Sequence, residues 1–241
     1  MEKVLLVIQA RMGSTRLPGK VMKEVFGRPL LSYLIERLRP LNSKIVVATS
    51  TSDREKPIVS FCSEHGISYF LGDEEDVLAR FFNVACMEKA ENLVRITADC
   101  PLLDYRVLDR TLRFYFQSHF DYVANTLKSP YPRGMDVEIF SKRALDIAFE
   151  KAQALEEREH VTLYFKRNPK LFRLGYVPYL DEHPPYRLTV DTKEDFILVK
   201  KIIEALHPKN SLFSLEDIVN FLVKRPKLAK INANIKQKCI T

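Results

Sequence analysis

The sequence predicts a three-layer α/β fold in which helices cover both faces of a mostly parallel sheet. Short apolar runs rich in Val and Ile alternate four times with segments of helical spacing in the first half of the chain. That alternation is typical of parallel sheets with crossover helices. Polar loops follow three of the apolar runs, at 10–20, 49–53 and 97–101. Because ligands of such sheets bind at the carboxyl ends of the strands, we expect these loops to meet in one crevice.

The elements of the first half follow from apolar spacing and from residues that start or stop helices. An apolar run that ends at turn residues predicts a buried strand over 3–9. Pro29 opens the first helix, Gly66 closes the second, and four acidic residues at 73–76 suit the positive end of the third. Further strands are expected over 44–48, 67–71, 93–96 and 122–124, and helices over 29–38, 54–65, 73–90 and 105–118.

The second half is less regular. Alternation over 135–140 predicts a strand with Asp136 and Glu138 on one face. Thr192, with Asp195 three residues later, predicts the capped start of a helix that runs to residue 206. Helices are also expected over 142–152, 156–167 and 214–224, and strands over 172–177 and 186–190.

The amino-acid composition limits the classes to which this protein can belong. The chain has 241 residues, 46% hydrophobic and 29% charged, which suits one globular domain. Its apolar runs fall far short of the roughly 20 residues that cross a membrane, and the first run is too short for a signal peptide. We therefore expect a cytoplasmic protein.

The cysteines, which lack metal-binding or CxxC spacing, are expected to be reduced. They are Cys62, Cys86, Cys100 and Cys239.

The net charge of +7 is concentrated near the C-terminus. Residues 207–241 contain seven Lys or Arg against Glu216 and Asp217, so the preceding residues are nearly neutral. No interleaving of aromatic and basic residues indicates a nucleic-acid partner. We interpret 207–241 as a basic helical tail with a solvated face.

The stretch 10–20, Ala-Arg-Met-Gly-Ser-Thr-Arg-Leu-Pro-Gly-Lys, is the strongest functional signal. Its glycines allow close approach of the backbone to an anion, and its arginines and lysine neutralise charge. The spacing excludes a P-loop, because five residues separate Gly13 from Gly19 and Val21 follows Lys20. A different kind of phosphate site is predicted.

Asp99 and Asp191 each follow an apolar run. Two carboxylates at strand ends, beside a basic phosphate loop, suggest Mg²⁺ held by the carboxylates and by phosphate oxygens. Each aspartate has an alternative role as the cap of the helix that follows it.

Other polar residues are weaker candidates. The carboxylates of Asp136 and Glu138 could contact an acceptor or a second metal, or form the exposed face of an edge strand. His160 could contact a substrate or lie at the surface. Arg95 lies inside an apolar run, which predicts a paired and partly buried side chain. Cys100 has no visible base beside it, so we do not expect a nucleophile.

Three segments resemble a known family. Residues 10–20 resemble the N-terminal signature of the CMP-sugar synthetases, above all CMP-Kdo synthetase. Residues 97–102, Thr-Ala-Asp-Cys-Pro-Leu, resemble a metal-binding segment of that family, with Ala98 in place of a glycine, and residues 190–195 resemble its second metal segment. Residues 133–138 with 158–161 look most like the branch named for spore coat polysaccharide biosynthesis protein F.

The resemblance implies a nucleotide-diphospho-sugar transferase (Rossmann-like) fold and a cytidylyltransferase reaction in surface polysaccharide synthesis. An oxygen of an acid sugar or related acceptor would attack the α-phosphate of CTP with the help of Mg²⁺. The implied domain spans 1–206, with nucleotide-binding residues in 1–125 and acceptor or dimer contacts in 126–206, and relatives are commonly homodimers. CTP contacts are expected from Ala10, Arg11, Gly13, Ser14, Arg16, Lys20, Asp76 and Arg80.

The same resemblance implies the catalytic residues, whereas the acceptor contacts rest on the residues alone, because the sugar-contacting residues of the Kdo and sialic-acid enzymes do not transfer cleanly onto 125–180. Catalysis is expected from Lys20, Arg11, Asp99 and Asp191, of which the two aspartates would hold the metal. Acceptor binding is expected from Arg133, Asp136, Glu138 and His160.

Two other functions stay open from the residues alone. A glycosyltransferase of the same fold usually carries an Asp-x-Asp motif, which this sequence lacks. A non-catalytic protein that binds a nucleotide or polymer would instead rely on the basic tail.

Overall fold

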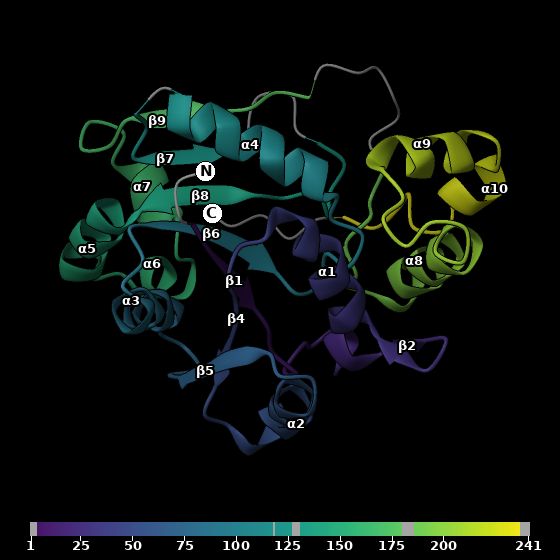
Figure 1. The fold of residues 1–241 in the computed structure, drawn as a ribbon, viewed down its shortest axis with the longest axis horizontal. Helices are drawn as coiled ribbons and strands as arrows, with labels where there is room; N and C mark the ends of the chain where they lie inside the picture. Colours follow the sequence, from purple (N-terminus) through teal and green to yellow (C-terminus); the bar gives the residue numbers. More distant parts are fainter. Residues whose placement is uncertain (1–3, 118, 127–130, 180–185, 237–241) are drawn as a thin grey trace.

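The computed structural model describes residues 4–117, 119–126, 131–179 and 186–236. Its centre is a seven-stranded sheet in the order β5-β4-β1-β6-β8-β7-β9 (Figure 1). The strands are β1 (Leu5–Gln9), β4 (Ile45–Ser50), β5 (Ser68–Gly72), β6 (Asn92–Thr97), β7 (Tyr122–Ala124), β8 (Glu138–Ser141) and β9 (Leu174–Tyr176). Strands β5, β4, β1 and β6 are parallel, and β8 runs antiparallel to both β6 and β7. The predicted three-layer, mostly parallel fold is confirmed.

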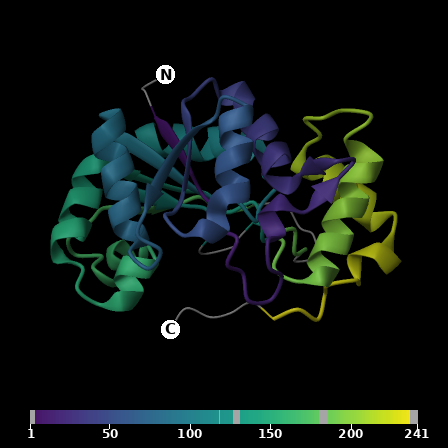
Figure 2. The same cartoon turned by 90° about the horizontal axis from the view of Figure 1, so that it is seen from below.

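Helices cover both faces of the sheet (Figures 1 and 2). One face packs against α1 (Leu30–Leu38), α2 (Lys56–Glu64), α4 (Tyr105–Gln117), α8 (Lys193–Leu206) and α9 (Leu215–Val223). The other packs against α3 (Val77–Glu88), α5 (Lys142–Lys151) and α7 (Leu163–Arg167), and the short α6 (Leu155–Glu159) contacts α3. The strand sides alternate: Leu6 and Ile8 face the first layer, and Leu5 and Val7 face the second.

Several helix starts follow the predicted capping chemistry. The Thr192 hydroxyl accepts the Asp195 N–H at the start of α8, and the Asp195 carboxylate accepts the Thr192 N–H in return. Helix α3 begins at Val77 rather than at residue 73. The reason is that the Asp73 carboxylate accepts the N–H groups of Glu75 and Asp76 at 2.8 and 2.9 Å, which forms a turn before the helix.

Two of the elements predicted for the second half, a helix and a strand, do not form as expected. The helix expected over 156–167 is interrupted at His160, whose φ and ψ are −107° and 82°, because the fully buried Val161 is drawn into the core. The strand expected over 186–190 makes only an isolated bridge between Arg133 and Arg187. It packs against a loop instead of a strand, and Gly134 (φ 101°) permits the close approach: a Cβ there would lie 2.6 Å from the Leu188 backbone.

The loop over residues 131–137 also changes the expected strand over 135–140. Strand β8 starts at Glu138, so Asp136 lies before it and does not share a strand face with Glu138.

A hairpin that was not predicted from the sequence joins β2 (Glu24–Val25) to β3 (Arg28–Pro29). Its two turn residues, Phe26 and Gly27, have φ values of 51° and 69°, as a tight two-residue hairpin turn requires.

The C-terminal segment packs onto the body of the protein. Helix α9 buries Leu215, Ile218 and Leu222 in the same core as β1 and α1. With α8 and α10 (Pro226–Ala229) it forms a lobe at the opposite end of the molecule from α5 (Figures 1 and 2). The basic side chains of 224–230 are exposed. The division of the chain at residue 206 stays a prediction.

Some sequence predictions fall outside the described residues: Lys3, residue 118 and the end of the tail with Cys239. Cys62, Cys86 and Cys100 are free thiols. Among the helices in the described ranges, none combines the length and apolar character needed to span a membrane.

Candidate active site

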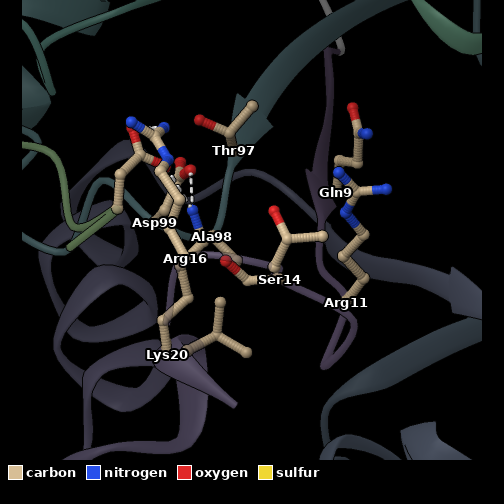
Figure 3. A pocket seen from close by; sticks show the side chains of 11 residues that line it. Gln9, Arg11, Ser14, Arg16, Lys20, Thr97, Ala98 and Asp99 are labelled. Atoms are coloured by element: carbon tan, nitrogen blue, oxygen red, sulfur yellow. Dashed lines mark hydrogen bonds and ion pairs between the residues drawn. The ribbon is translucent and has the colours of Figure 1, made fainter. Parts of the chain in front are cut away.

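The predicted crevice lies at the carboxyl ends of β1 and β6, but only two of the three expected loops, 10–20 and 97–101, line it, and residues 49–53 do not. It is a cavity of about 200 Å³. The end of β1, the loop after it and the end of β6 meet there (Figure 3), and Asp191, just before α8, completes the lining. Its lining residues are Gln9, Arg11, Ser14, Thr15, Arg16, Lys20, Val21, Thr97, Ala98, Asp99 and Asp191.

Met12 organises the loop over residues 10–20. Its carbonyl accepts the N–H groups of Ser14 and Gly19 at 2.8 and 3.0 Å, so the loop folds back on itself. Its N–H donates to the buried Glu55 at 2.8 Å. Gly19 takes a left-handed conformation (φ 66°), which glycine adopts without steric cost, and leads Lys20 toward the cavity.

Lys20 lies between the two aspartates that the sequence placed at strand ends. Its ammonium donates to Asp99 Oδ2 at 2.6 Å and to Asp191 Oδ1 at 2.7 Å, across 79 and 171 residues of chain. The lysine is only 8% exposed. Two carboxylates that share one buried cation are close enough to share a metal ion.

Asp191 is held by three cations. Besides Lys20, Arg16 lies 2.9 Å and Arg187 2.5 Å from its Oδ2 atom. Burial alone would raise the pKa of Asp191, but these cations more than offset it and lower that pKa. Burial would likewise lower the pKa of Lys20, and the negative charges of Asp99 and Asp191 raise it. Asp191 and Lys20 are therefore both charged at neutral pH.

The opposite side of the cavity is formed by Gln9 and Arg11 (Figure 3). Gln9 Oε1 accepts from Arg95 Nε and Nη2 at 3.2 and 3.0 Å. Because an arginine can only donate, these bonds fix the amide oxygen of Gln9 toward Arg95 and leave its NH₂ group for the cavity. Gln9 is a site residue that was not predicted from the sequence, where its place at the end of the first strand was its only signal.

Glu138 fixes the position of Arg95 through an ion pair. It pairs with Arg95 and accepts from Tyr122 Oη, Thr162 Oγ1 and Lys166 Nζ at 2.6, 2.7 and 2.8 Å. The Glu138 side chain is only 6% exposed. The predicted pairing of Arg95 is confirmed. Its contacts favour a role for Glu138 in fixing Arg95 and Gln9 over direct contact with an acceptor.

The other predicted nucleotide-binding residues lie outside the cavity lining. Ala10 is buried beneath the loop, and Gly13 lies beside Arg54. Asp76 caps α3 through the N–H of Ala79 at 2.8 Å and pairs with Arg158. Arg80 is 2% exposed, and its Nε and Nη1 atoms have no hydrogen-bond partner among the described residues. Contact of these residues with a nucleotide stays a prediction.

The remaining acceptor-binding candidates lie around the second half of the sheet. Arg133 pairs with Asp136 at 3.4 Å. His160 is half-buried between α6 and α7, and burial lowers its pKa, with Arg95 and Arg11 acting in the same direction. Their contact with an acceptor also stays a prediction.

Asp136 provides a test of the electrostatics around the site. Burial raises its pKa from 3.8 to about 6. A folded-state pKa above the unfolded value means that the charged form costs stability above pH 6, and that this cost disappears below pH 4, where both states are protonated. We expect Asp136→Asn to increase the free energy of unfolding by about 1–3 kcal/mol more at pH 8 than at pH 4.

Denaturant unfolding at the two pH values measures this difference. Asp53→Asn, whose parent side chain is 90% exposed, is the control and should show no such difference. Equal effects of Asp136→Asn at both pH values would contradict the raised pKa of the Asp136 carboxyl.

The donor set at Lys20 fits a hard divalent cation. Asp99 and Asp191 offer carboxylate oxygens, the ligands that Mg²⁺ prefers, and a bound phosphate would supply more. Within the described ranges, no group of three or more His, Cys, Asp or Glu side chains could hold a metal without other ligands. The residues therefore fit a cation that binds together with its substrate.

Comparisons with known proteins agree with this geometry. Residues 5–232 match the family model described as Cytidylyltransferase. Spore coat polysaccharide biosynthesis protein SpsF from Bacillus subtilis is 34% identical, over 95% of this chain and 98% of that protein. A 3-deoxy-manno-octulosonate cytidylyltransferase from Acidobacterium capsulatum is 26% identical, over 83% of this chain and 96% of that protein.

A solved structure is also similar along the whole length. The cytidylyltransferase from Leptospira borgpetersenii superposes with a TM-score of 0.89 at 31% identity, covering 98% of this chain and 99% of that one. The superposition therefore extends over nearly the whole of both chains.

Proposed function

Because the chain belongs to the cytidylyltransferase family, we propose that it transfers CMP from CTP to an acid sugar or a related acceptor. Family membership makes the chain a nucleotidyltransferase. The acid-sugar acceptor is supported by similarity to a 3-deoxy-manno-octulosonate cytidylyltransferase, and a role in surface polysaccharide synthesis by similarity to SpsF. The observation that carries the proposal is the pair of carboxylates joined by Lys20 inside a cavity lined by Arg11 and Arg16.

The reaction forms one bond and breaks one. An oxygen of the acceptor bonds to the α-phosphorus of CTP, the bond from that phosphorus to the bridging oxygen of the β-phosphate breaks, and pyrophosphate leaves. The acceptor hydroxyl gives up its proton to solvent or a nearby base. The protein has to place the two oxygens in line and stabilise the charge on the phosphates.

The residues of the cavity suit these tasks. Arg11, Arg16 and Lys20 would bind the triphosphate, and the hydroxyl of Ser14 lies in the same lining. Asp99 and Asp191 would hold Mg²⁺, which when bound neutralises charge on the phosphate oxygens. Gln9 would donate from the opposite side of the cavity, and His160, Arg133 and Asp136 are the proposed acceptor contacts.

Asp99 provides the test of the metal site. We expect Asp99→Asn to lower pyrophosphate release from CTP by about 100-fold at an Mg²⁺ concentration that saturates the unmodified protein, because the amide is a far weaker ligand. Raising Mg²⁺ should recover part of the loss. The measurement is pyrophosphate release across a panel of acid sugars with each nucleoside triphosphate, followed by Mg²⁺ titration with the acceptor that works.

Asp109→Asn, on α4 and outside the cavity lining, is the matched control and should retain full activity. An unchanged Mg²⁺ titration for Asp99→Asn would refute its role as a ligand. Pyrophosphate release supported by UTP but not CTP would refute the proposed nucleotide.

A further inference from the structure

We propose that Asn232, in the C-terminal segment, is a positioning residue for the carboxylate of Asp191. The inference rests on the proposed function, because it takes Asp191 as a ligand of the divalent cation. A chain of buried hydrogen bonds connects the two residues through Asp195 and Arg187, and nothing in the sequence motifs pointed to it.

Asn232 makes two hydrogen bonds with one nitrogen atom. Its Nδ2 donates to the Arg187 carbonyl at 2.9 Å and to Asp195 Oδ1 at 2.8 Å. Both partners can only accept, so the amide nitrogen must face them and both of its hydrogens are used. The residue is only 2% exposed, which leaves little access for water to replace either bond.

Asp195 is fully buried and accepts four hydrogen bonds. Its Oδ1 atom accepts from Asn232 and from Arg187 Nε at 3.0 Å. Its Oδ2 atom accepts the N–H groups of Asp191 and Thr192, each at 3.0 Å. The backbone of Asp191 is therefore fixed by the same carboxylate that Asn232 holds.

Arg187 completes the chain to the site. Its Nε atom is bound to Asp195 and its Nη2 atom lies 2.5 Å from Asp191 Oδ2. With its carbonyl held by Asn232, Arg187 is fixed at both its backbone and its guanidinium. This arrangement turns Asp191 so that its other oxygen, Oδ1, faces Lys20 and Asp99. Loss of Asn232 would remove one donor from Asp195 and release the Arg187 backbone, so Asp191 would lose its fixed orientation.

The position of Asn232 in the fold explains why the sequence does not predict its role. It follows α10, 41 residues after Asp191 in the numbering, in the segment interpreted as a basic tail. Helix α9 anchors that segment through its buried apolar face. The hydrogen bonds of Asn232 then act on the side of Asp191 that lies away from the cavity.

The test separates positioning from simple attachment of the C-terminal segment. The variants are Asn232→Ala and the similarly sized Asn232→Leu, and the control is Ile218→Ala, which weakens the packing of α9 without touching the hydrogen bonds. The affinity for CTP is measured by calorimetry in EDTA and with Mn²⁺, and the affinity for Mn²⁺ by electron paramagnetic resonance at saturating CTP. Thermal unfolding is recorded for every variant.

We expect both Asn232 variants to bind Mn²⁺ about 10- to 100-fold more weakly in the presence of CTP, as is typical when the support of a metal ligand is removed. Their affinity for CTP in EDTA should change less than about twofold, since the side chains of Lys20, Arg11 and Arg16 remain. Ile218→Ala should lower the unfolding temperature and leave Mn²⁺ affinity unchanged.

Normal Mn²⁺ affinity in either folded Asn232 variant would overturn the inference and leave Asn232 as an attachment point. A parallel loss of Mn²⁺ affinity in Ile218→Ala would also overturn it, because general loosening would then explain the effect. Failure of the unmodified protein to bind CTP and Mn²⁺ would instead overturn the proposed function, and the inference with it.

Discussion

Replacing Lys20 with alanine is expected to reduce pyrophosphate release from CTP by at least about 10³-fold. The lysine is the buried cation at the junction of the loop over residues 10–20 and the two carboxylates, 2.6 Å from Asp99 and 2.7 Å from Asp191. Its removal takes away a positive charge where the triphosphate would bind. It also leaves two neighbouring carboxylates without the cation that they share.

The loss of the cation shared by Asp99 and Asp191 has a second measurable effect, on the affinity for Mn²⁺. Because the ammonium occupies the position that a metal ion would share between Asp99 and Asp191, it competes with the metal when no nucleotide is present. Lys20→Ala should therefore bind Mn²⁺ more tightly than the unmodified protein in the absence of CTP, while losing turnover. Calorimetry with Mn²⁺ and the pyrophosphate assay measure the two effects on the same preparation.

Lys23→Ala is the matched control, because its parent ammonium lies near the ring of Phe196, at 5.7 Å from the centroid, and outside the cavity lining. It should keep both properties. Full turnover in Lys20→Ala, or loss of Mn²⁺ binding together with turnover, would contradict the arrangement proposed for the site.

Replacing Glu138 with alanine is expected to lower the free energy of unfolding by about 3–5 kcal/mol. The loss is large because Glu138 is the shared acceptor of Arg95, Lys166, Tyr122 and Thr162, and its removal leaves two cations without their buried anion. Denaturant unfolding at pH 7 measures it. Glu150→Ala, an exposed position on α5, is the control and should stay within about 0.5 kcal/mol of the unmodified protein.

The pH dependence of the free energy of unfolding gives a second test of the interactions of Glu138. Burial would raise its pKa, but Lys166 and Arg95 more than offset this and hold that pKa far below the usual 4.5. A depressed folded-state pKa contributes stability that is complete above pH 4.5 and declines as the pH falls. Glu138→Gln should therefore lose less stability than the unmodified protein between pH 5 and 3. An identical acid dependence of the two proteins would show that Glu138 is not charged in the folded state.

The parts of the fold that were predictable have local causes. Strands β1, β4 and β6 are short apolar runs that end in polar loops, and the capping pair of Thr192 and Asp195 marks the start of α8. The meeting of the loop over residues 10–20 with Asp99 followed from the rule that parallel strands share one carboxyl edge, whereas Asp191 reaches them from a segment that makes only an isolated bridge. Each of these signals lies within a few residues of the element that it specifies.

The parts that were missed depend on contacts between distant residues. Asp136 and Glu138 alternate in sequence like one strand face, yet only Glu138 enters the strand, because Arg95 and Lys166 compensate its charge there. Val161 ends a helix because a core position is available to it. No local pattern shows which distant residue will supply the partner, and Gln9 and Asn232 were missed for the same reason.

The most direct test of the site is a crystal structure of the protein with CTP and Mn²⁺, in which the anomalous signal locates the metal. We expect a Mn²⁺ peak between the carboxylates of Asp99 and Asp191, with the Lys20 ammonium moved from them onto a phosphate oxygen of CTP. A Mn²⁺ peak elsewhere, or a nucleotide bound outside the cavity while Lys20 still joins both carboxylates, would contradict the proposal that these three residues form the catalytic centre.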